Sequence, residues 1–269
     1  MINLLIYIFF ITPYFLSNSR VIRDENPRAE FKLVWSDEFD TDGLPDSSNW
    51  NYDIGSRNGW GNNELQYYTS RKENARVENG ILILEARKEN FESFGYTSAR
   101  IKTRNKGDWK YGKIEVMAKL PMGRGTWPAI WMLPTMEGRM SWPDDGEIDI
   151  MEHVGFDPGS IHGTIHTKAY NHTIGTQKGN TINIDDFSDA FHLYTIEWNP
   201  DRISWFVDED RYFVYENEGT GKDAWPFDNP FHLILNIAVG GNWGGQMGVD
   251  DSIWPQRMQI DWVRVYQEN

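Results

Sequence analysis

Three acidic residues interrupt an otherwise apolar run in the middle of the chain, Glu147, Asp149 and Glu152 in the sequence EIDIME. Successive side chains of a β-strand point to opposite faces, so Glu147 and Asp149 would share one face while Ile148 enters the opposite layer. Strict alternation would send Glu152 to the wrong face. One extra residue near Met151, a β-bulge, would return Glu152 to the face of Glu147, and bulges beside active sites do re-aim side chains.

Carboxylates that share one face of a cleft repel one another, and the repulsion is relieved when at least one of them holds a proton near neutral pH. Cleavage of a glycosidic bond uses two carboxyl groups across the bond, and a gap of about 5 to 5.5 Å makes one of them a nucleophile and retains the configuration of the sugar. We therefore predict that Glu147 is the nucleophile and Glu152 the general acid and base. Asp149 is expected to hydrogen-bond the nucleophile and to share a proton, so that Glu147 stays ionised while Glu152 stays protonated.

Two other interpretations of the acidic run are open. Charged residues on strands usually decorate a solvated edge strand, but the isoleucines of this run indicate an inner strand, and three tryptophans, Trp127, Trp131 and Trp142, lie nearby in the sequence. Clustered oxygens also suit calcium or magnesium. Cation-binding loops, however, usually present their oxygens from turns and not from one strand with an apolar opposite face, so catalytic acids are favoured.

The elements that must position these acids are short strands. Beyond residue 30, apolar and alternating runs are separated by Gly, Pro, Asn and Asp, which is typical of all-β proteins. An acidic turn at residues 208–210 is expected to join two such runs as a hairpin. The pattern of many short antiparallel strands predicts a β-sandwich or jelly roll. The clearest strands are expected at residues 81–86, 113–120, 147–152, 194–198, 203–207, 212–215, 232–239 and 258–266.

The composition limits the kinds of ligand. Of the 269 residues 39% are hydrophobic, enough to bury one substantial core, and we expect a single catalytic domain over residues 31–267. A formal net charge of −14 argues against nucleic acid, which needs a cationic surface. The absence of cysteine from the sequence excludes disulfides, thiolate metal sites and cysteine nucleophiles. A neutral ligand fits this balance, and we expect a monomer.

The N-terminus opens with an apolar run at residues 2–16, broken by Thr12 and Pro13 and followed by three polar residues. This run is typical of a signal peptide, which we expect over residues 1–19, and it is too short for a comfortable membrane span. A retained anchor is the alternative. Residues 20–30 then form a short N-terminal segment. We expect a secreted protein, extracellular or periplasmic, without stable membrane association after removal of the signal.

From residue 31 to 267 the sequence resembles glycoside hydrolase family 16, and within it the bacterial laminarinases, which are endo-acting β-1,3-glucanases. The resemblance rests on the bulged acidic run at 147–152 and on the segments GWGNNELQYY at 59–68, WPAIWMLP at 127–134 and GGNW at 240–243. The lichenase branch typically uses the shorter, regular-strand spacing. The resemblance implies a β-sandwich jelly roll of two curved antiparallel sheets with a concave substrate cleft. It also implies a retaining hydrolase of internal β-1,3-glucosidic bonds in laminarin-like polysaccharide, with no cofactor for the chemistry and the three acids in the roles given above.

The resemblance also implies seven substrate-binding residues. Flat tryptophan rings suit the apolar face of a pyranose, and amide and charged groups offer hydrogen bonds to sugar hydroxyls. The expected residues are Asn62, Glu64, Arg100, Trp127, Trp131, His166 and Trp243. The ordinary structural alternatives are a core position for the tryptophans, an ion pair between Glu64 and Arg100 that joins loops, and a structural role for His166. In the cleft, near the acid/base side, the His166 ring would tune Glu152 or bind a hydroxyl.

Many members of the family carry a calcium ion on the convex face, remote from catalysis and bound partly by backbone carbonyls. The matching positions here are Glu38, Gly80 and Asp261. Oxygen ligands and an acidic chain are compatible with such a site, and a cation that binds only the folded state stabilises that state. The resemblance therefore implies a structural Ca²⁺.

Other functions are compatible with this fold. A non-catalytic glucan-binding lectin would use the same jelly roll and the same aromatic residues, since fold does not fix function. A binder has no need of three mutually repelling carboxylates, so the acidic run favours an enzyme. Among enzymes, a mixed-linkage (1,3;1,4)-β-glucanase or a transglycosylase would use the same residues, and only the products distinguish them.

Overall fold

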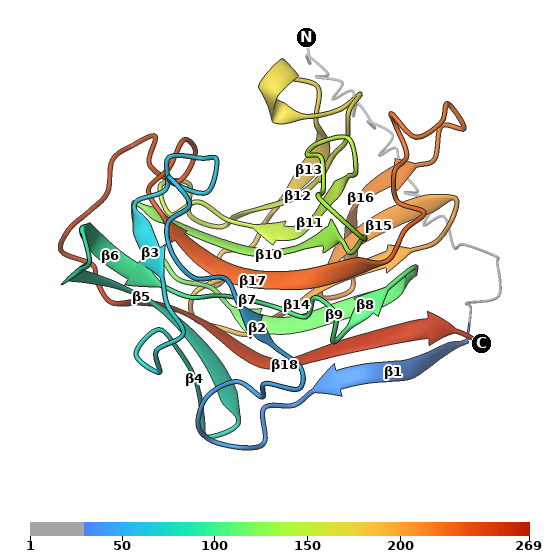
Figure 1. The fold of residues 1–269 in the computed structure, drawn as a ribbon. Coiled ribbons are helices and arrows are strands. Elements are labelled where there is room, and N and C mark those ends of the chain that lie inside the picture. The colour runs from blue at the N-terminus through green and yellow to red at the C-terminus, as the bar shows by residue number, and fades with distance from the viewer. Residues whose placement is uncertain (1–29) are drawn as a thin grey trace, which may run out of the picture.

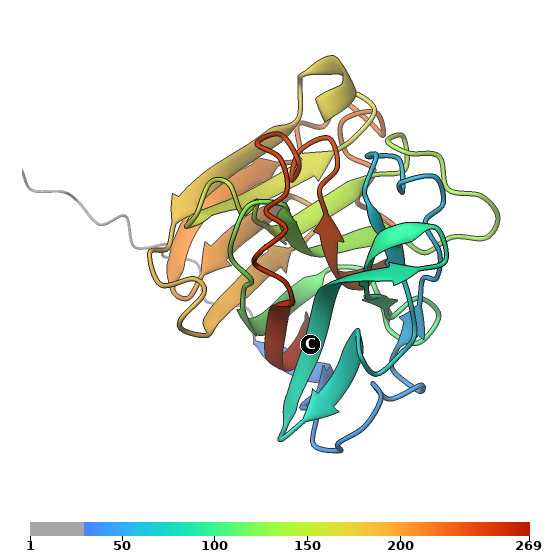
Figure 2. The ribbon, with the colours of Figure 1, turned by 90° about the vertical axis from the view of Figure 1, so that its left-hand side faces the viewer.

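The computed structural model describes residues 30–269. The expected signal peptide at 1–19, and all but the last residue of the segment at 20–30, lie outside the described residues. Figure 1 shows two curved sheets stacked face to face, and Figure 2 shows the same layers after a quarter turn. The expected all-β fold is confirmed, since residues 30–269 form eighteen strands and one short 3-10 helix, η1 (His172–Ile174). Within this range no helix has the length and apolar character needed to span a membrane.

One sheet has ten strands and the other has eight. The first contains β1 (Phe31–Asp37), β3 (Gln66–Tyr68), β4 (Ala75–Glu78), β5 (Ile81–Phe91), β6 (Phe94–Ser98), β9 (Gly112–Lys119), β14 (His192–Trp198), β15 (Arg202–Val207), β16 (Asp210–Glu216) and β18 (Gln256–Glu268). Its order is β16-β15-β14-β9-β18-β5-β6-β3, with β1 beside β18 and β4 beside β5.

The eight-stranded sheet carries the acidic run. It contains β2 (Asn51–Tyr52), β7 (Arg100–Lys102), β8 (Asp108–Trp109), β10 (Thr126–Pro134), β11 (Glu147–Glu152), β12 (Ser160–His166), β13 (Lys178–Asn183) and β17 (Phe231–Val239). Its order is β13-β12-β11-β10-β17-β7-β2, with β8 beside β17. In Figure 1 this sheet is the upper layer, and the chain rises into loops on both sides of it.

The eight strands expected from the alternation of apolar residues are all present, with ends that differ by no more than five residues from the expected ones. The hairpin between β15 and β16 is also confirmed, and its turn places Asp208 at a positive φ of 54°. One pairing departs from the antiparallel expectation, because β3 and β6 run parallel.

The core fills the space between the two sheets, and a bulge in β18 shows how the sequence encodes it. Met258 and Ile260 are buried at even positions, whereas Val263 and Val265 are buried at odd positions. The buried positions change from even to odd residue numbers because the pairing register of β18 with β9 shifts between Ile260 and Trp262. An extra residue in one strand reverses which side chains face inward.

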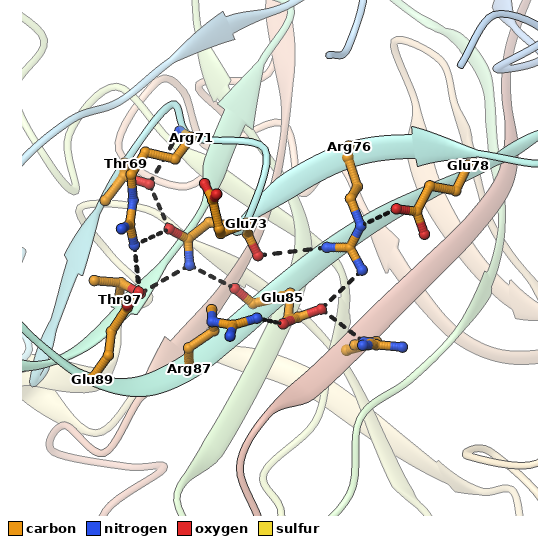
Figure 3. A network of polar contacts seen from close by, with 11 residues as sticks. Thr69, Arg71, Glu73, Arg76, Glu78, Glu85, Arg87, Glu89 and Thr97 are labelled. Atoms are coloured by element: carbon orange, nitrogen blue, oxygen red, sulfur yellow. Dashed lines mark hydrogen bonds and ion pairs between the residues drawn. The ribbon is translucent and has the colours of Figure 1, made fainter. Parts of the chain in front are cut away.

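Figure 3 shows a polar network that fastens the edge of the ten-stranded sheet. The Glu85 carboxylate of β5 is fully buried, and it pairs with Arg76 of β4 (3.0 Å), with Arg257 of β18 (2.8 Å) and with Arg87. A buried carboxylate without partners would cost several kcal/mol, so the three arginines make this position tolerable and tie β4, β5 and β18 together. The network lies in the ten-stranded sheet, whereas the acidic run lies in the other.

Candidate active site

The acidic run forms β11, which lies between β10 and β12. Residues directly opposite each other on antiparallel strands share one face of the sheet. Glu147 lies opposite His166 of β12, and Asp149 lies opposite Trp131 of β10. Glu147, Asp149 and Trp131 line one cleft, so the pairing of three strands brings the two acids and an aromatic side chain to the same surface.

The expected β-bulge is present in β11. Between Asp149 and Glu152 the register with β12 shifts, so that Ile150 and Met151 together oppose the single residue Gly163. Both Ile150 and Met151 are buried in the core, at 1% and 0% exposure. Two consecutive side chains thus enter the core, and Glu152 returns to the face of the other acids, where it lines the cleft.

The bulge is held from the core side by Trp205 of β15. Its Nε1 donates to the backbone oxygen of Asp149 at 2.8 Å. The Trp205 ring lies so close to Gly163 that a Cβ at that position would stand 2.6 Å from it. Gly163 is therefore required by this close approach, and the tryptophan fixes the backbone that carries the acids.

The cleft has a volume of about 430 Å³. The lining residues that lie on strands come from β7, β10, β11 and β17, which are four neighbouring strands, so the cleft crosses the strands instead of following one of them. The small side chains of Ala129 and Ala238 leave width in the cleft. Besides these and the three acids, the lining residues are Arg57, Trp60, Gly61, Asn62, Glu64, Arg100, Trp127, Trp131, Leu133, Met140, Trp142, His172, Thr173 and Asn236.

Burial raises the pKa of Glu147 well above the usual range of a carboxyl group, and the charges of Asp149 and Glu152 raise it further. Two groups lower the pKa: His166, whose Nε2 lies 3.9 Å from Glu147 Oε1, and Trp142, whose Nε1 donates to Glu147 Oε2 at 3.0 Å. These two groups stabilise the ionised form of Glu147, which is the form that a nucleophile needs.

Asp149 is buried and Glu152 is half-buried. Burial raises the pKa of Asp149 well above its usual range, the charge of Glu152 raises it further, and a hydrogen bond with Glu147 lowers it. Burial raises the pKa of Glu152, while His166 and the Trp127 Nε1 donor, 3.0 Å from Oε1, lower it. Burial and mutual repulsion therefore favour a proton within the cluster, which is what a general acid needs.

His166 lies against the acids but on the side of Glu147. The side chain is 6% exposed, and its Nε2 lies 3.4 Å from Asp149 Oδ2 and 3.9 Å from Glu147 Oε1. The sequence placed it in the cleft near the acid/base Glu152, whereas the register places it directly opposite Glu147. His166 is thus a buried neighbour of two carboxylates, and the described lining of the cleft does not include it.

The three expected tryptophans occupy different positions. Trp127 and Trp131 line the cleft, and Trp131 Nε1 donates to Asn236 Oδ1 at 2.7 Å. Trp243 packs edge-to-face on Trp127, with ring centroids 5.6 Å apart, and on His162 at 4.9 Å. Trp243 is absent from the lining residues described between 30 and 269, so it supports Trp127.

The polar residues Asn62, Glu64 and Arg100 all line the cleft. Arg100 Nε lies 3.1 Å from Asp53 Oδ2, and Glu64 accepts a hydrogen bond from Gln66 Nε2 at 2.6 Å. These two partners take the place of the direct Glu64–Arg100 ion pair that was the structural alternative. Burial raises the pKa of Glu64, and the charge of Arg100 lowers it.

Several residues that line the cleft were not predicted from the sequence. Asn236 could have been recognised from the sequence, because it is a polar residue within the otherwise largely apolar β17 and a buried polar group needs a partner. His172 and Thr173 come from η1, and Arg57 and Trp60 come from the loop between β2 and β3. No periodic pattern marks these loop positions, since the fold alone brings them to the cleft.

The three positions matched to a calcium site lie at one end of neighbouring strands. The register of β1 and β5 with β18 brings Glu38, Gly80 and Asp261 to the same corner of the ten-stranded sheet. Arg264 holds both oxygens of the Glu38 carboxylate, at 2.9 and 2.8 Å. Backbone carbonyls are therefore the oxygens that Glu38 and Gly80 offer, and this donor set fits Ca²⁺, which accepts carbonyl ligands.

A β-sandwich whose cleft holds two glutamates and an aspartate, with tryptophan donors on both glutamates, defines a glycoside hydrolase. Residues 62–264 match the model of the glycosyl hydrolases family 16. The chain belongs to this family.

The relatives agree with this assignment. The chain is 55% identical over 267 residues to the beta-glucanase of Rhodothermus marinus, covering 96% of this chain and 93% of that protein. The X-ray structure of the laminarinase from Rhodothermus marinus superimposes with a TM-score of 0.87, covering 90% of this chain and 100% of that one, at 55% identity. SCLam, a non-specific endo-beta-1,3(4)-glucanase from the same family, gives a TM-score of 0.84 at 50% identity, covering 90% and 93%.

Proposed function

We propose that this chain is an endo-acting, retaining hydrolase of β-1,3-glucan, with laminarin-like polysaccharide as its substrate. The observation that carries the proposal is the cluster of three acids in an open cleft, in which each glutamate is half-buried and accepts a hydrogen bond from a tryptophan. The similarity to a beta-glucanase and to a laminarinase supports the substrate class. A cleft that crosses four strands suits a long polymer better than a single sugar.

Glu147 and Glu152 divide the reaction into two steps. Glu147 attacks the anomeric carbon while Glu152 gives its proton to the oxygen of the leaving chain, and a glycosyl ester forms on Glu147. Glu152, now a carboxylate, then takes a proton from the water that attacks the same carbon. Glu147 is released as a carboxylate and Glu152 is protonated again. Asp149 assists through its hydrogen bond with Glu147 and by sharing a proton within the cluster.

A second candidate is a broader β-glucanase or a transglycosylase with the same residues. The 50% identity to a non-specific endo-beta-1,3(4)-glucanase favours activity on mixed linkages. Parallel digestion of laminarin, mixed-linkage β-glucan, agarose and carrageenan, followed by chromatography of the products, tests the proposal. We expect oligosaccharides from laminarin. Agarose as the sole substrate would overturn the proposal, and longer products than the starting oligosaccharides would identify transglycosylation.

The stereochemistry of the first product tests the two-step mechanism. Two inversions at one carbon give net retention, so the sugar released first should have the β configuration. Proton NMR at the earliest times of laminari-oligosaccharide hydrolysis resolves the two anomers before they equilibrate. A dominant α-anomer at the first time points would show inversion and a wider gap between the carboxyl groups than we infer.

We propose that Glu38, Gly80 and Asp261 bind a structural Ca²⁺. A calcium concentration 100 times the dissociation constant would stabilise the folded state by about 2.7 kcal/mol. Differential scanning calorimetry should then show a midpoint roughly 5 to 10 °C higher in calcium than in excess EGTA, since 1 kcal/mol shifts a domain of this size by about 2 to 4 °C. Asp261→Asn removes a negative charge at the site and should reduce this difference. Equal midpoints in calcium and EGTA would contradict the site.

We propose that the protein is exported and acts as a monomer, with residues 1–19 removed. The apolar run at 2–16 supports this proposal. Expression of the full chain in a bacterial host should yield periplasmic or extracellular enzyme whose N-terminus, read by Edman degradation, begins near residue 20. An enzyme that stays membrane-bound with its original N-terminus would favour the retained anchor.

A further inference from the structure

Three ligand atoms converge beside the nucleophile. His166 Nε2, Glu147 Oε1 and Asp149 Oδ2 all lie within 4.8 Å of one another, with His166 Nε2 at 3.4 Å from the aspartate oxygen and 3.9 Å from the glutamate oxygen. The other oxygen of Glu147 is occupied by the Trp142 donor. The Oε1 of Glu147 is therefore the oxygen that faces the imidazole nitrogen.

The Asp149 side chain supplies an independent indication. It is 1% exposed, and within residues 30–269 its Oδ2 is a buried oxygen without a hydrogen-bond partner. An unsatisfied buried carboxylate oxygen costs free energy, which a cation in contact with it would offset. This oxygen points toward His166 Nε2, so the unsatisfied atom faces the centre of the triad.

The spacing matches a tetrahedral zinc site. With Zn–N and Zn–O bonds of about 2.0 to 2.2 Å at tetrahedral angles, two ligand atoms lie roughly 3.3 to 3.5 Å apart. The His166–Asp149 distance of 3.4 Å falls in this range, and Glu147 at 3.9 Å needs to move by only a few tenths of an ångström. An imidazole with two carboxylates favours zinc over magnesium or calcium, which prefer oxygen ligands alone.

The site is open to solvent through the cleft, because Glu147 and Asp149 line it. We propose that His166, Glu147 and Asp149 bind a zinc ion that inhibits the enzyme by occupying the oxygen needed for attack on the sugar. The inhibitory effect, though not the binding, rests on the proposed role of Glu147 as nucleophile. Zinc and glucan then exclude each other, so zinc acts as a competitive inhibitor.

Isothermal titration calorimetry of chelator-treated full-length enzyme with ZnCl₂ measures the binding, and initial rates on laminari-oligosaccharides measure the inhibition. We expect one zinc per chain, an apparent KM that rises with zinc while kcat is unchanged, full recovery with EDTA, and no inhibition by MgCl₂ at the same concentration. His166→Asn should weaken zinc binding by about 100-fold or more, since removal of even a supporting partner of a ligand costs 10- to 100-fold. Asp149→Asn, which keeps the shape of the side chain, should weaken binding in the same direction.

His192→Asn is the matched control. His192 also lies between two carboxylates, but its Nε2 faces Asp186 (3.2 Å) and its Nδ1 faces Asp208 (3.0 Å), so the three groups share no common point. Its replacement should leave zinc affinity unchanged. Circular dichroism confirms folding of each variant before titration.

Unchanged zinc affinity in folded His166→Asn or Asp149→Asn would place the metal elsewhere and overturn the proposal, as would a wild-type enzyme that neither binds zinc nor is inhibited by it. A different result would contradict the proposed function. An enzyme without activity on any β-glucan in the absence of zinc would contradict the proposed function, while the calorimetric comparison would still decide where zinc binds.

Discussion

Glu147→Gln should abolish the hydrolysis of laminarin while leaving the glucan bound. The covalent step needs a carboxylate, which an amide cannot supply, so we expect kcat to fall by on the order of 10⁴-fold or more. Glutamine keeps an oxygen for the Trp142 Nε1 donor and removes a negative charge beside Asp149. The loss should therefore be chemical and not a loss of fold. Initial rates with a reducing-sugar assay measure the effect.

Binding and folding are the controls for this variant. Calorimetric titration with a laminari-oligosaccharide should give a dissociation constant close to that of the native enzyme, because the other lining side chains of the cleft are untouched. Glu147→Ser should lose hydrolysis as well. Glu209→Gln, an exposed acid in the turn between β15 and β16, should keep full activity. Near-normal turnover of either Glu147 variant would remove this residue from the role of nucleophile.

The second large effect is expected when the length of the bulge is changed. Replacing Met151 by two residues, for example methionine and alanine, should eliminate activity, because buried Ile150 and Met151 and the Trp205 hydrogen bond keep the bulge, and one more residue after the bulge turns the glutamate away from the cleft. Deleting Met151 should have the opposite outcome. Glu147, Asp149 and the former Glu152 would then fall on one face by simple alternation, and measurable glucanase activity should remain.

Both changes affect stability. Met151 is fully buried, so the deletion removes packing and should lower the free energy of unfolding by on the order of 2 to 5 kcal/mol, as for other large core truncations. The insertion turns a carboxylate toward the core, which is also costly. Circular dichroism and thermal melts must therefore accompany the activity assays. Activity retained by a folded insertion variant would show that the bulge at Ile150 and Met151 is not what places the acid/base.

The sequence predicted the strand that carries the acids because its information is local. Glu147, Asp149 and Glu152 fall on one face only if an extra residue separates the last two, and the structure contains that bulge at Ile150 and Met151. The other expected strands were recognisable for the same reason, since inward and outward side chains alternate along each of them. Their catalytic roles remain a proposal, which the variants above test.

The details of the cleft wall could not be predicted in the same way. The sequence suggested Arg100 and Glu64 as a possible pair, yet Arg100 pairs with Asp53 and Glu64 with Gln66. Trp243 was expected in the cleft, and it packs edge-to-face on Trp127, which lines the cleft. The partner of each side chain and its position at the cleft depend on how loops distant in sequence pack against one another, and no local pattern encodes them.

By itself, the sequence determined the all-β architecture, the apolar alternation of the strands and the spacing that brings the three acids to one surface. Each of these depends only on neighbouring residues in one segment of the chain. The tertiary structure alone decided which partner each acid has. His166 reaches Glu147 and Asp149 only because β12 pairs with β11 in one register, and Trp127 and Trp142 reach the two glutamates only through the packing of β10 and of the loop before β11. Partners across strands are fixed by register and burial, and these arise only when the whole sheet has formed.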